Sequence, residues 1–225
     1  RLIALESWRY RTIVIGEDLG TVPPGFDTVL DEAGVSGIRV LWFQREKTSF
    51  LPPSDWSRQA IAVTTTHDLP TVAGWWSGAD LAWRERLGQL EDGLPAAREQ
   101  RREDRSQLWQ GLVQQGCASG PLPEAAPALK EGDEESALPV ALDDCAMVVD
   151  AALDYVAAAP ASLAVVPVED ILGLTQQPNL PGMTEPHPNW RRRLPEDTPQ
   201  LFSAYAAKAR LERLRRVRGG TAKEI

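Results

Sequence analysis

The chain has 225 residues, of which 43% are hydrophobic and 25% are charged, a composition typical of a folded globular protein and not of a disordered one. Its formal net charge of −8 disfavours nucleic acid and anionic membrane surfaces as partners, and no apolar run approaches the roughly 20 residues that a membrane helix requires. Two isolated cysteines and only two histidines argue against a disulfide or a metal centre and favour a cytoplasmic location.

Apolar runs and helix signals alternate at the start of the chain. They predict strands at 12–16, 37–43 and 60–66, and a helix over 26–33 that follows two prolines and ends at a glycine. The first and third runs are β-branched and nearly continuous, as expected of strands buried on both faces. The short connections between these strands predict successive β/α units of a parallel sheet or barrel over residues 1–80.

The pattern changes in the middle of the chain, which we interpret as a helical insertion over 81–160. Helices are predicted at 81–90, 95–116 and 140–159. A solvated acidic loop, rich in Gly, Pro and Glu, is predicted at 118–138.

The C-terminal part, 161–225, returns to the earlier pattern. It is predicted to contain a last strand at 162–168, a long proline-rich loop at 173–195 and a helix at 199–218. The arginines of this helix alternate with apolar residues at helical spacing, which favours an amphipathic surface helix over a nucleic-acid-binding segment.

Carboxylates follow two of the predicted strands directly. Glu17 and Asp18 come after the first strand, and His67 and Asp68 come after the third. Parallel α/β folds build their active sites at the C-terminal ends of strands. Glycosidic bond cleavage needs a carboxylic acid that protonates the leaving oxygen, and a carboxylate that stabilises the positive charge growing at the anomeric carbon. Carboxylates at the ends of two neighbouring strands are the arrangement from which glycoside chemistry recruits these two groups.

Seven short motifs occur in the order found in the 4-α-glucanotransferases, also called amylomaltases or disproportionating enzymes, and the chain resembles that family from near its first residue to about residue 194. The motifs are Gly-Glu-Asp-Leu-Gly at 16–20, Gly-Ile-Arg-Val-Leu at 37–41, Thr-His-Asp at 66–68, Gly-Trp-Trp at 74–76, Glu-Asp-Ile-Leu-Gly-Leu at 169–174, Asn-Leu-Pro-Gly at 179–182 and His-Pro-Asn-Trp-Arg-Arg-Arg-Leu at 187–194.

The resemblance implies an α/β fold, namely the C-terminal half of a (β/α)8 TIM-type barrel with a helical insertion. It also implies a retaining enzyme that cleaves an α-1,4-glucan and transfers the glucosyl chain to the 4-hydroxyl of another sugar. The substrates would be α-1,4-glucans and maltodextrins, with glucose or maltose as acceptor, and the chemistry would need no metal and no organic cofactor.

The resemblance also implies roles for single residues. Glu17 matches the acid/base and Asp68 the transition-state stabiliser, with His67 contacting sugar hydroxyls. Asn179 has two open interpretations, a sugar contact or a turn former. The nucleophile of the family, an Asp in an Arg-x-Asp motif on the preceding strand, would lie upstream of Arg1.

Two expectations follow from that missing strand. The chain would be a C-terminal piece that is inactive alone, a reading that agrees with its start at Arg rather than Met. Half a barrel exposes strand edges and apolar core, so we expect it to need the N-terminal half or to self-associate. Two other functions stay open: an α-glucan hydrolase of the same fold, and a non-catalytic glucan-binding or interaction module.

Structural roles compete with functional ones at several motif residues. We expect Asp18 to pair with an Arg or cap a loop. Trp75 and Trp76 are expected in the core. For Glu169 and Asp170, a substrate contact and a loop anchor are equally open. The segment 187–191 is expected to fix the long loop rather than touch substrate.

Overall fold

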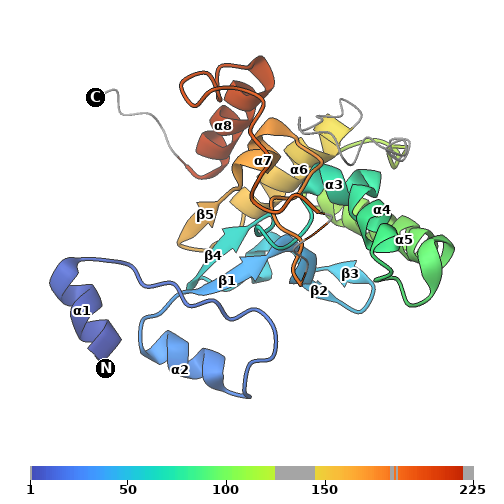
Figure 1. Ribbon diagram of the computed structural model, residues 1–225. Helices are drawn as coiled ribbons and strands as arrows, with labels where there is room; N and C mark the ends of the chain where they lie inside the picture. Colours follow the sequence, from blue (N-terminus) through green and yellow to red (C-terminus); the bar gives the residue numbers. More distant parts are fainter. Residues whose placement is uncertain (1, 125–144, 183–184, 186, 220–225) are drawn as a thin grey trace.

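The computed structural model describes residues 2–124, 145–182, 185 and 187–219, and Figure 1 shows a parallel sheet with helices packed over one face. The sheet contains β1 (Gly37–Val40), β4 (Ala60–Val63) and β5 (Leu163–Val165), in the order β1-β4-β5. Gly37 pairs with Ala60 and Ile61 with Leu163, so the three strands run parallel and lie side by side in chain order. This confirms the predicted α/β class.

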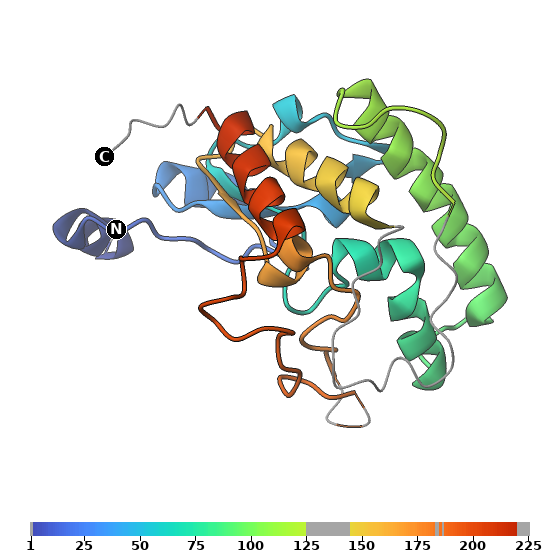
Figure 2. The same cartoon turned by 90° about the horizontal axis from the view of Figure 1, so that it is seen from above.

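The predicted strand at 12–16 is wrong in extent. Only Ile15 pairs, through a parallel bridge to Ser36 at the outer edge of β1. Ile13 is 63% exposed and Ile15 is 42% exposed, whereas a strand buried on both faces was expected. Within the described residues, no strand pairs with Ile15 on the side that faces away from β1. The N-terminal helix α1 (Leu2–Tyr10) buries none of its residues and projects away from the sheet in Figure 2.

The first half of the chain adds short elements around the sheet. Helix α2 (Phe26–Glu32) confirms the predicted helix. The strand expected at 37–43 stops at Val40, where a 3-10 turn, η1 (Leu41–Phe43), begins. The sequence analysis missed a small antiparallel hairpin, formed by β2 (Arg45–Glu46) and β3 (Ser49–Phe50). A second 3-10 turn, η2 (Pro53–Asp55), lies in the proline-rich turn that precedes β4.

Three helices follow β4, where two were predicted. They are α3 (Val72–Ser77), α4 (Ala79–Arg86) and α5 (Gly93–Gln114). Helix α3 begins at Thr71, whose hydroxyl oxygen accepts a hydrogen bond from the Gly74 N–H at 3.0 Å. Gly78, with φ of 85°, separates α3 from α4.

The last helices are α6 (Ala146–Ala157), α7 (Val168–Leu172) and α8 (Tyr205–Val217). Helix α8 starts six residues later than the predicted 199–218 helix. Residues 125–144 lie outside the described part of the chain, and they contain most of the acidic loop expected at 118–138 and the start of the helix expected at 140–159.

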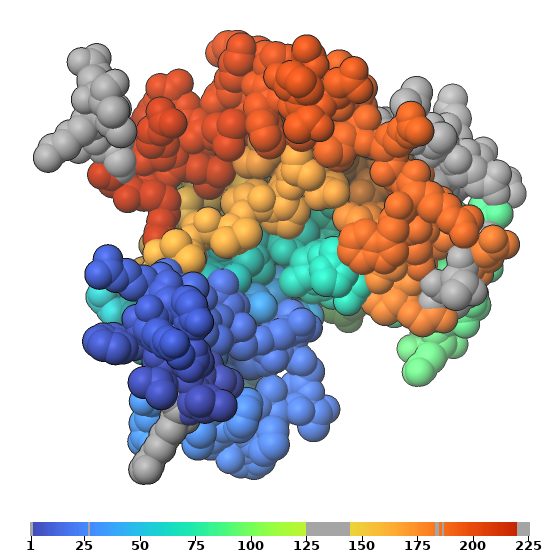
Figure 3. All heavy atoms as spheres, turned by 60° about the vertical axis from the view of Figure 1, so that its left-hand side comes forward, coloured from blue at the N-terminus to red at the C-terminus, as the bar shows by residue number. Residues whose placement is uncertain are grey.

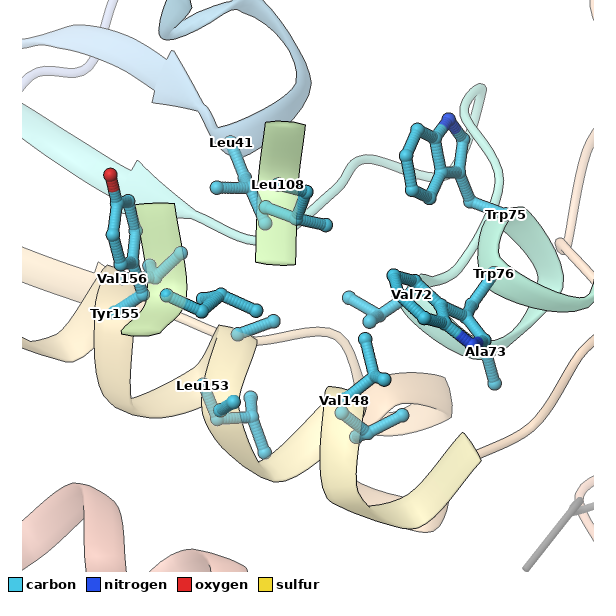
Figure 4. Close-up of a cluster of buried hydrophobic side chains, with 14 of the residues drawn as sticks. Leu41, Val72, Ala73, Trp75, Trp76, Leu108, Val148, Leu153, Tyr155 and Val156 are labelled. Atoms are coloured by element: carbon cyan, nitrogen blue, oxygen red, sulfur yellow. The ribbon is translucent and has the colours of Figure 1, made fainter. Parts of the chain in front are cut away.

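Helix α6 lies between the sheet and α8, and it supplies more buried residues to one apolar core than any other helix or strand does (Figure 4). Side chains of α6 such as Val148, Leu153 and Tyr155 are buried against α3, α5 and the sheet. Trp75 and Trp76 belong to this core, being 8% and 0% exposed, which confirms their expected packing role.

The opposite face of the sheet has its own small apolar cluster. Val40, Ile61 and Val63 form it, and Leu19 and Leu69 pack against it. Alternate residues of β4 therefore point into two different cores, so this strand is buried on both faces as predicted. Leu19 and Leu69 also bring the segments that carry Glu17 and Asp68 onto the same face of the sheet.

Candidate active site

His67, Asp68 and Asn179 come together just beyond the C-terminal end of β4. The Asn179 side-chain amide donates a hydrogen bond to Asp68 Oδ1 at 2.6 Å, and the Asn179 backbone N–H donates to the His67 carbonyl at 3.2 Å. His67 Nε2 lies 3.3 Å from Asp68 Oδ1. The His67 and Asp68 side chains are 55% and 43% exposed, so a ligand can reach both. Three of the four predicted site residues therefore form one polar cluster.

The loop that carries Asn179 is fixed from behind by Asn189. Its Oδ1 accepts from the Leu180 N–H at 2.8 Å, and its Nδ2 donates to the Leu180 carbonyl at 3.2 Å. The buried ring of His187 contacts the same Oδ1 and packs edge-on against Trp83. Burial lowers the pKa of His187 and thereby favours the neutral form of this imidazole, against the hydrogen bond with Asn189, which favours the charged form. The expectation that segment 187–191 fixes the loop is confirmed at His187 and Asn189.

Asp170 anchors the floor below the polar cluster. Its carboxylate, which is fully buried, accepts hydrogen bonds from the Thr64 hydroxyl and from the Val72 N–H, the latter at 2.8 Å. Burial raises the pKa of Asp170 to about 6, and the two hydrogen bonds oppose that rise. Because no ligand can reach a fully buried carboxylate, Asp170 is a structural anchor. Its neighbour Glu169, in contrast, lines a surface cavity.

Glu17 and Asp18 follow the Ile15 bridge at the edge of β1. Asp18 accepts hydrogen bonds from the Ile38 N–H at 2.8 Å and from the Arg39 guanidinium at 2.6 Å. Burial alone would raise the pKa of Asp18, but these partners outweigh burial and hold the pKa below its ordinary value. The expected pairing of Asp18 with an Arg is confirmed, and Asp18 is thereby fixed as a backbone clamp.

Glu17 differs from its neighbour because its side chain is exposed. Within the described ranges, no hydrogen bond or ion pair joins Glu17 to the cluster of His67, Asp68 and Asn179. The structure thus brings three predicted site residues into contact and leaves the fourth on a neighbouring segment of the same face.

Two cavities open beside the polar cluster, one at His67 and one at Asp68. One of about 310 Å³ has His67, Glu169, Trp190 and Arg193 among its lining residues. The other, of about 320 Å³, is lined by Asp68 itself and by Trp42 and Trp75. Trp42 stacks on Trp75 with ring centroids 4.7 Å apart, so one wall of the second cavity is aromatic.

The sequence analysis did not assign a site role to Trp190, although its indole lies against His67. The two ring centroids are 5.3 Å apart. The signal that could have revealed it was an aromatic residue inside a polar, arginine-rich motif, where burial is not the expected state. Figure 3 shows the orange loop that carries it beside the turquoise residues that follow β4.

Across the described ranges, no three His, Cys, Asp or Glu side chains are grouped as a metal ion would require. No helix in that same part of the chain combines the length and the apolar character needed to cross a membrane.

Comparisons with known proteins place this arrangement in a family. Residues 1–198 match the sequence model of the family described as 4-alpha-glucanotransferase. A 4-alpha-glucanotransferase of Mycobacterium tuberculosis is 33% identical over 209 residues, which cover 89% of this chain and 26% of that relative. A 4-alpha-glucanotransferase of Haemophilus influenzae is 31% identical over 209 residues, which cover 92% of this chain and 28% of that relative.

Solved structures agree with the sequence comparisons. The crystal structure of amylomaltase from Corynebacterium glutamicum has a TM-score of 0.73 and 25% sequence identity, covering 96% of this chain and 30% of that chain. Amylomaltase from Streptococcus agalactiae in complex with acarbose shares the fold, with a TM-score of 0.56 and 16% identity over 91% of this chain. The chain spans about a quarter of the length of the curated relatives cited, and it belongs to the 4-alpha-glucanotransferase family.

Proposed function

We propose that this chain supplies part of the active site of a 4-α-glucanotransferase, which transfers α-1,4-glucan segments between maltodextrins with glucose or maltose as acceptor. The observation that carries the proposal is the contact between Asp68 and Asn179 beside His67, at a strand end, in a chain of this family. The acarbose complex of the Streptococcus agalactiae relative supports an α-glucan-like ligand.

Asp68 suits the role of transition-state stabiliser because its orientation is already fixed. The Asn179 amide occupies one lone pair of Oδ1, and the exposed part of the carboxylate remains available to sugar hydroxyls. His67, tied to the same loop through its carbonyl, would contact hydroxyls of the sugar at the point of cleavage. A preorganised charge needs no reorientation as positive charge grows at the anomeric carbon.

Glu17 would be the acid/base of a retaining double displacement. It would protonate the leaving oxygen while a nucleophilic carboxylate, contributed from outside residues 1–225, attacks the anomeric carbon. It would then remove a proton from the incoming 4-hydroxyl, so that the glucosyl chain passes from the enzyme to the acceptor. In this proposal the chain alone is inactive, and the chemistry uses no metal and no organic cofactor.

The sheet supports the idea that this is half of a (β/α)8 barrel. Its strands lie side by side in chain order, as consecutive strands of a barrel do. Both outer edges carry exposed apolar residues, with Ile13 and Ile15 on one side and Leu163 and Val165 on the other. An N-terminal half, or less readily a second copy of the chain, would cover these edges. We place the enzyme in the cytoplasm, where maltodextrins would be its substrates.

The experiment incubates the protein, expressed from its complete reading frame, with maltotriose. Transfer yields glucose together with a ladder of longer glucans, which is the result we expect. If only shorter sugars form, the protein is a hydrolase and the proposal is wrong. If maltotriose binds without turnover, the protein is a glucan-binding module and the proposal is likewise wrong. Blotting source cells with an antibody against this chain gives the native mass, and a species far heavier than 24.7 kDa is expected.

A further inference from the structure

Trp190 is an exposed indole held in an uncommon backbone conformation. Its side chain is 66% exposed, whereas Trp75, Trp76 and Trp83 are all at most 8% exposed. Its φ is 59°, in the left-handed region that bulky residues rarely adopt. The Trp190 N–H donates to the Pro178 carbonyl at 3.0 Å, next to Asn179, and this bond fixes the turn. The fold therefore tolerates backbone strain to place an aromatic ring on the surface beside the site.

The surroundings of the ring suit a sugar. The indole lies 5.3 Å from the His67 ring, centroid to centroid, and both residues line the cavity of about 310 Å³. Apolar Leu174 and Pro178 line the same cavity, which also has polar groups from Thr66 and Glu169. A cavity that combines apolar surface with polar side chains, here including Gln176 and Arg193, is a usual form of a small-molecule site.

The chemistry of a glucosyl ring matches both kinds of group. One face of a pyranose carries C–H bonds that pack on the negative face of an aromatic ring, while its rim carries hydroxyls that need hydrogen-bonding partners. The indole offers the first surface. The Glu169 carboxylate and the exposed His67 imidazole offer the second.

We propose that Trp190 is a carbohydrate-stacking residue that binds a glucosyl ring of the α-glucan next to His67. The proposal deepens the function proposed above and rests on it, since it names one binding surface of that site. It assigns to Trp190 a direct substrate contact, where the sequence analysis expected segment 187–191 only to fix the loop.

The test compares Trp190→Gly and Trp190→Phe in the protein expressed from its complete reading frame. Glycine removes the ring but accepts a φ of 59° without strain, so the melting temperature should stay level or rise. Phenylalanine keeps an aromatic face. Trp8→Ala is the matched control, because Trp8 is also exposed, at 80%, but lies on α1 away from the site. The readouts are the Kd for acarbose by calorimetry, and KM and kcat for maltoheptaose.

We expect Trp190→Gly to raise the acarbose Kd and the maltoheptaose KM about tenfold, Trp190→Phe to stay within about threefold, and Trp8→Ala to change neither. If Trp190→Gly binds and turns over like the wild type, the stacking proposal is overturned while the proposed function stands. If Trp190→Gly lowers the melting temperature without a specific loss of binding, Trp190 has a structural role, and the stacking proposal is overturned as well. If the wild type binds acarbose but transfers no glucan, the proposed transferase function is refuted. The comparison of acarbose Kd values between the wild type and Trp190→Gly still decides the stacking proposal. A wild type that neither binds nor transfers overturns both.

Discussion

Replacing Asn179 with Asp turns the hydrogen bond to Asp68 into a contact between two carboxylates. The substitution keeps the shape of the side chain but replaces the donor, now 2.6 Å from Asp68 Oδ1, with a negatively charged oxygen. Since the two groups cannot both be ionised at that distance without repulsion, either one of them retains a proton or the loop moves away.

The size of the effect follows from the exposure of the pair. Two unit charges about 4 Å apart repel by about 1 kcal/mol in bulk water, and by about 4 kcal/mol at an effective dielectric constant of about 20. The Asp68 side chain is 43% exposed, which places the repulsion near the lower end, at about 1–2 kcal/mol. One pH unit corresponds to about 1.4 kcal/mol, so the acid limb of the pH–rate profile should move up by about one unit.

The assay is the pH dependence of kcat/KM for maltotriose disproportionation by the complete protein. The control is Asn179→Ala, which removes the hydrogen bond without adding charge; it should lower the rate and move the acid limb less than Asn179→Asp does. If Asn179→Asp reproduces the wild-type profile and rate, the contact with Asp68 has no part in catalysis, and the reasoning is refuted.

Two further predictions concern stability. Burial raises the folded pKa of Asp170 to about 6 from 3.8, so its proton stabilises the fold below about pH 4 and this contribution is lost as the pH rises through about 6. Urea unfolding of Asp170→Asn should therefore show a smaller fall in the free energy of unfolding between about pH 4 and 7 than the wild type, and an equal fall would contradict the assignment. Asp80 and Arg101 form a buried bidentate ion pair whose side chains are 7% and 8% exposed. Asp80→Ala should lower the free energy of unfolding by about 3–5 kcal/mol, because it leaves the buried Arg101 guanidinium without its carboxylate partner. The double variant Asp80→Ala with Arg101→Met should lose less stability, since no buried charge remains. A larger loss in the double variant than in Asp80→Ala would refute this interpretation.

The sequence pattern was most informative for a strand that is buried on both faces of the sheet. The run at 60–66 contains β4, which is buried on both faces, and so its continuous apolar pattern was informative. The run at 12–16 has a similar pattern, yet only Ile15 forms a bridge. Strand formation depends on a neighbouring strand as well as on propensity, and the described chain supplies one on a single side. The α3 helix was missed because its six residues are too few for a periodic signal.

The position of the candidate site in the fold was predictable from motifs, but the contacts made by its loop were not. His67 and Asp68 follow a strand, and a resemblance in sequence is enough to find them. The contact between Asp68 and Asn179 spans 111 residues and depends on the clamp at Asn189, which no local pattern reveals. The exposed position of Trp190 depends on a left-handed backbone angle, which tertiary hydrogen bonds impose.

The most direct test of the proposed function is turnover of maltotriose by Glu17→Gln in the complete protein, beside the wild type. Glutamine keeps the shape of Glu17 at this exposed position but cannot donate a proton as an acid, so the variant should fold normally. We expect wild-type protein to produce glucose and a ladder of longer glucans, and the variant to lose about 100-fold to 10,000-fold in rate. Near-normal disproportionation by Glu17→Gln, or a wild type that makes only shorter sugars, would contradict the account.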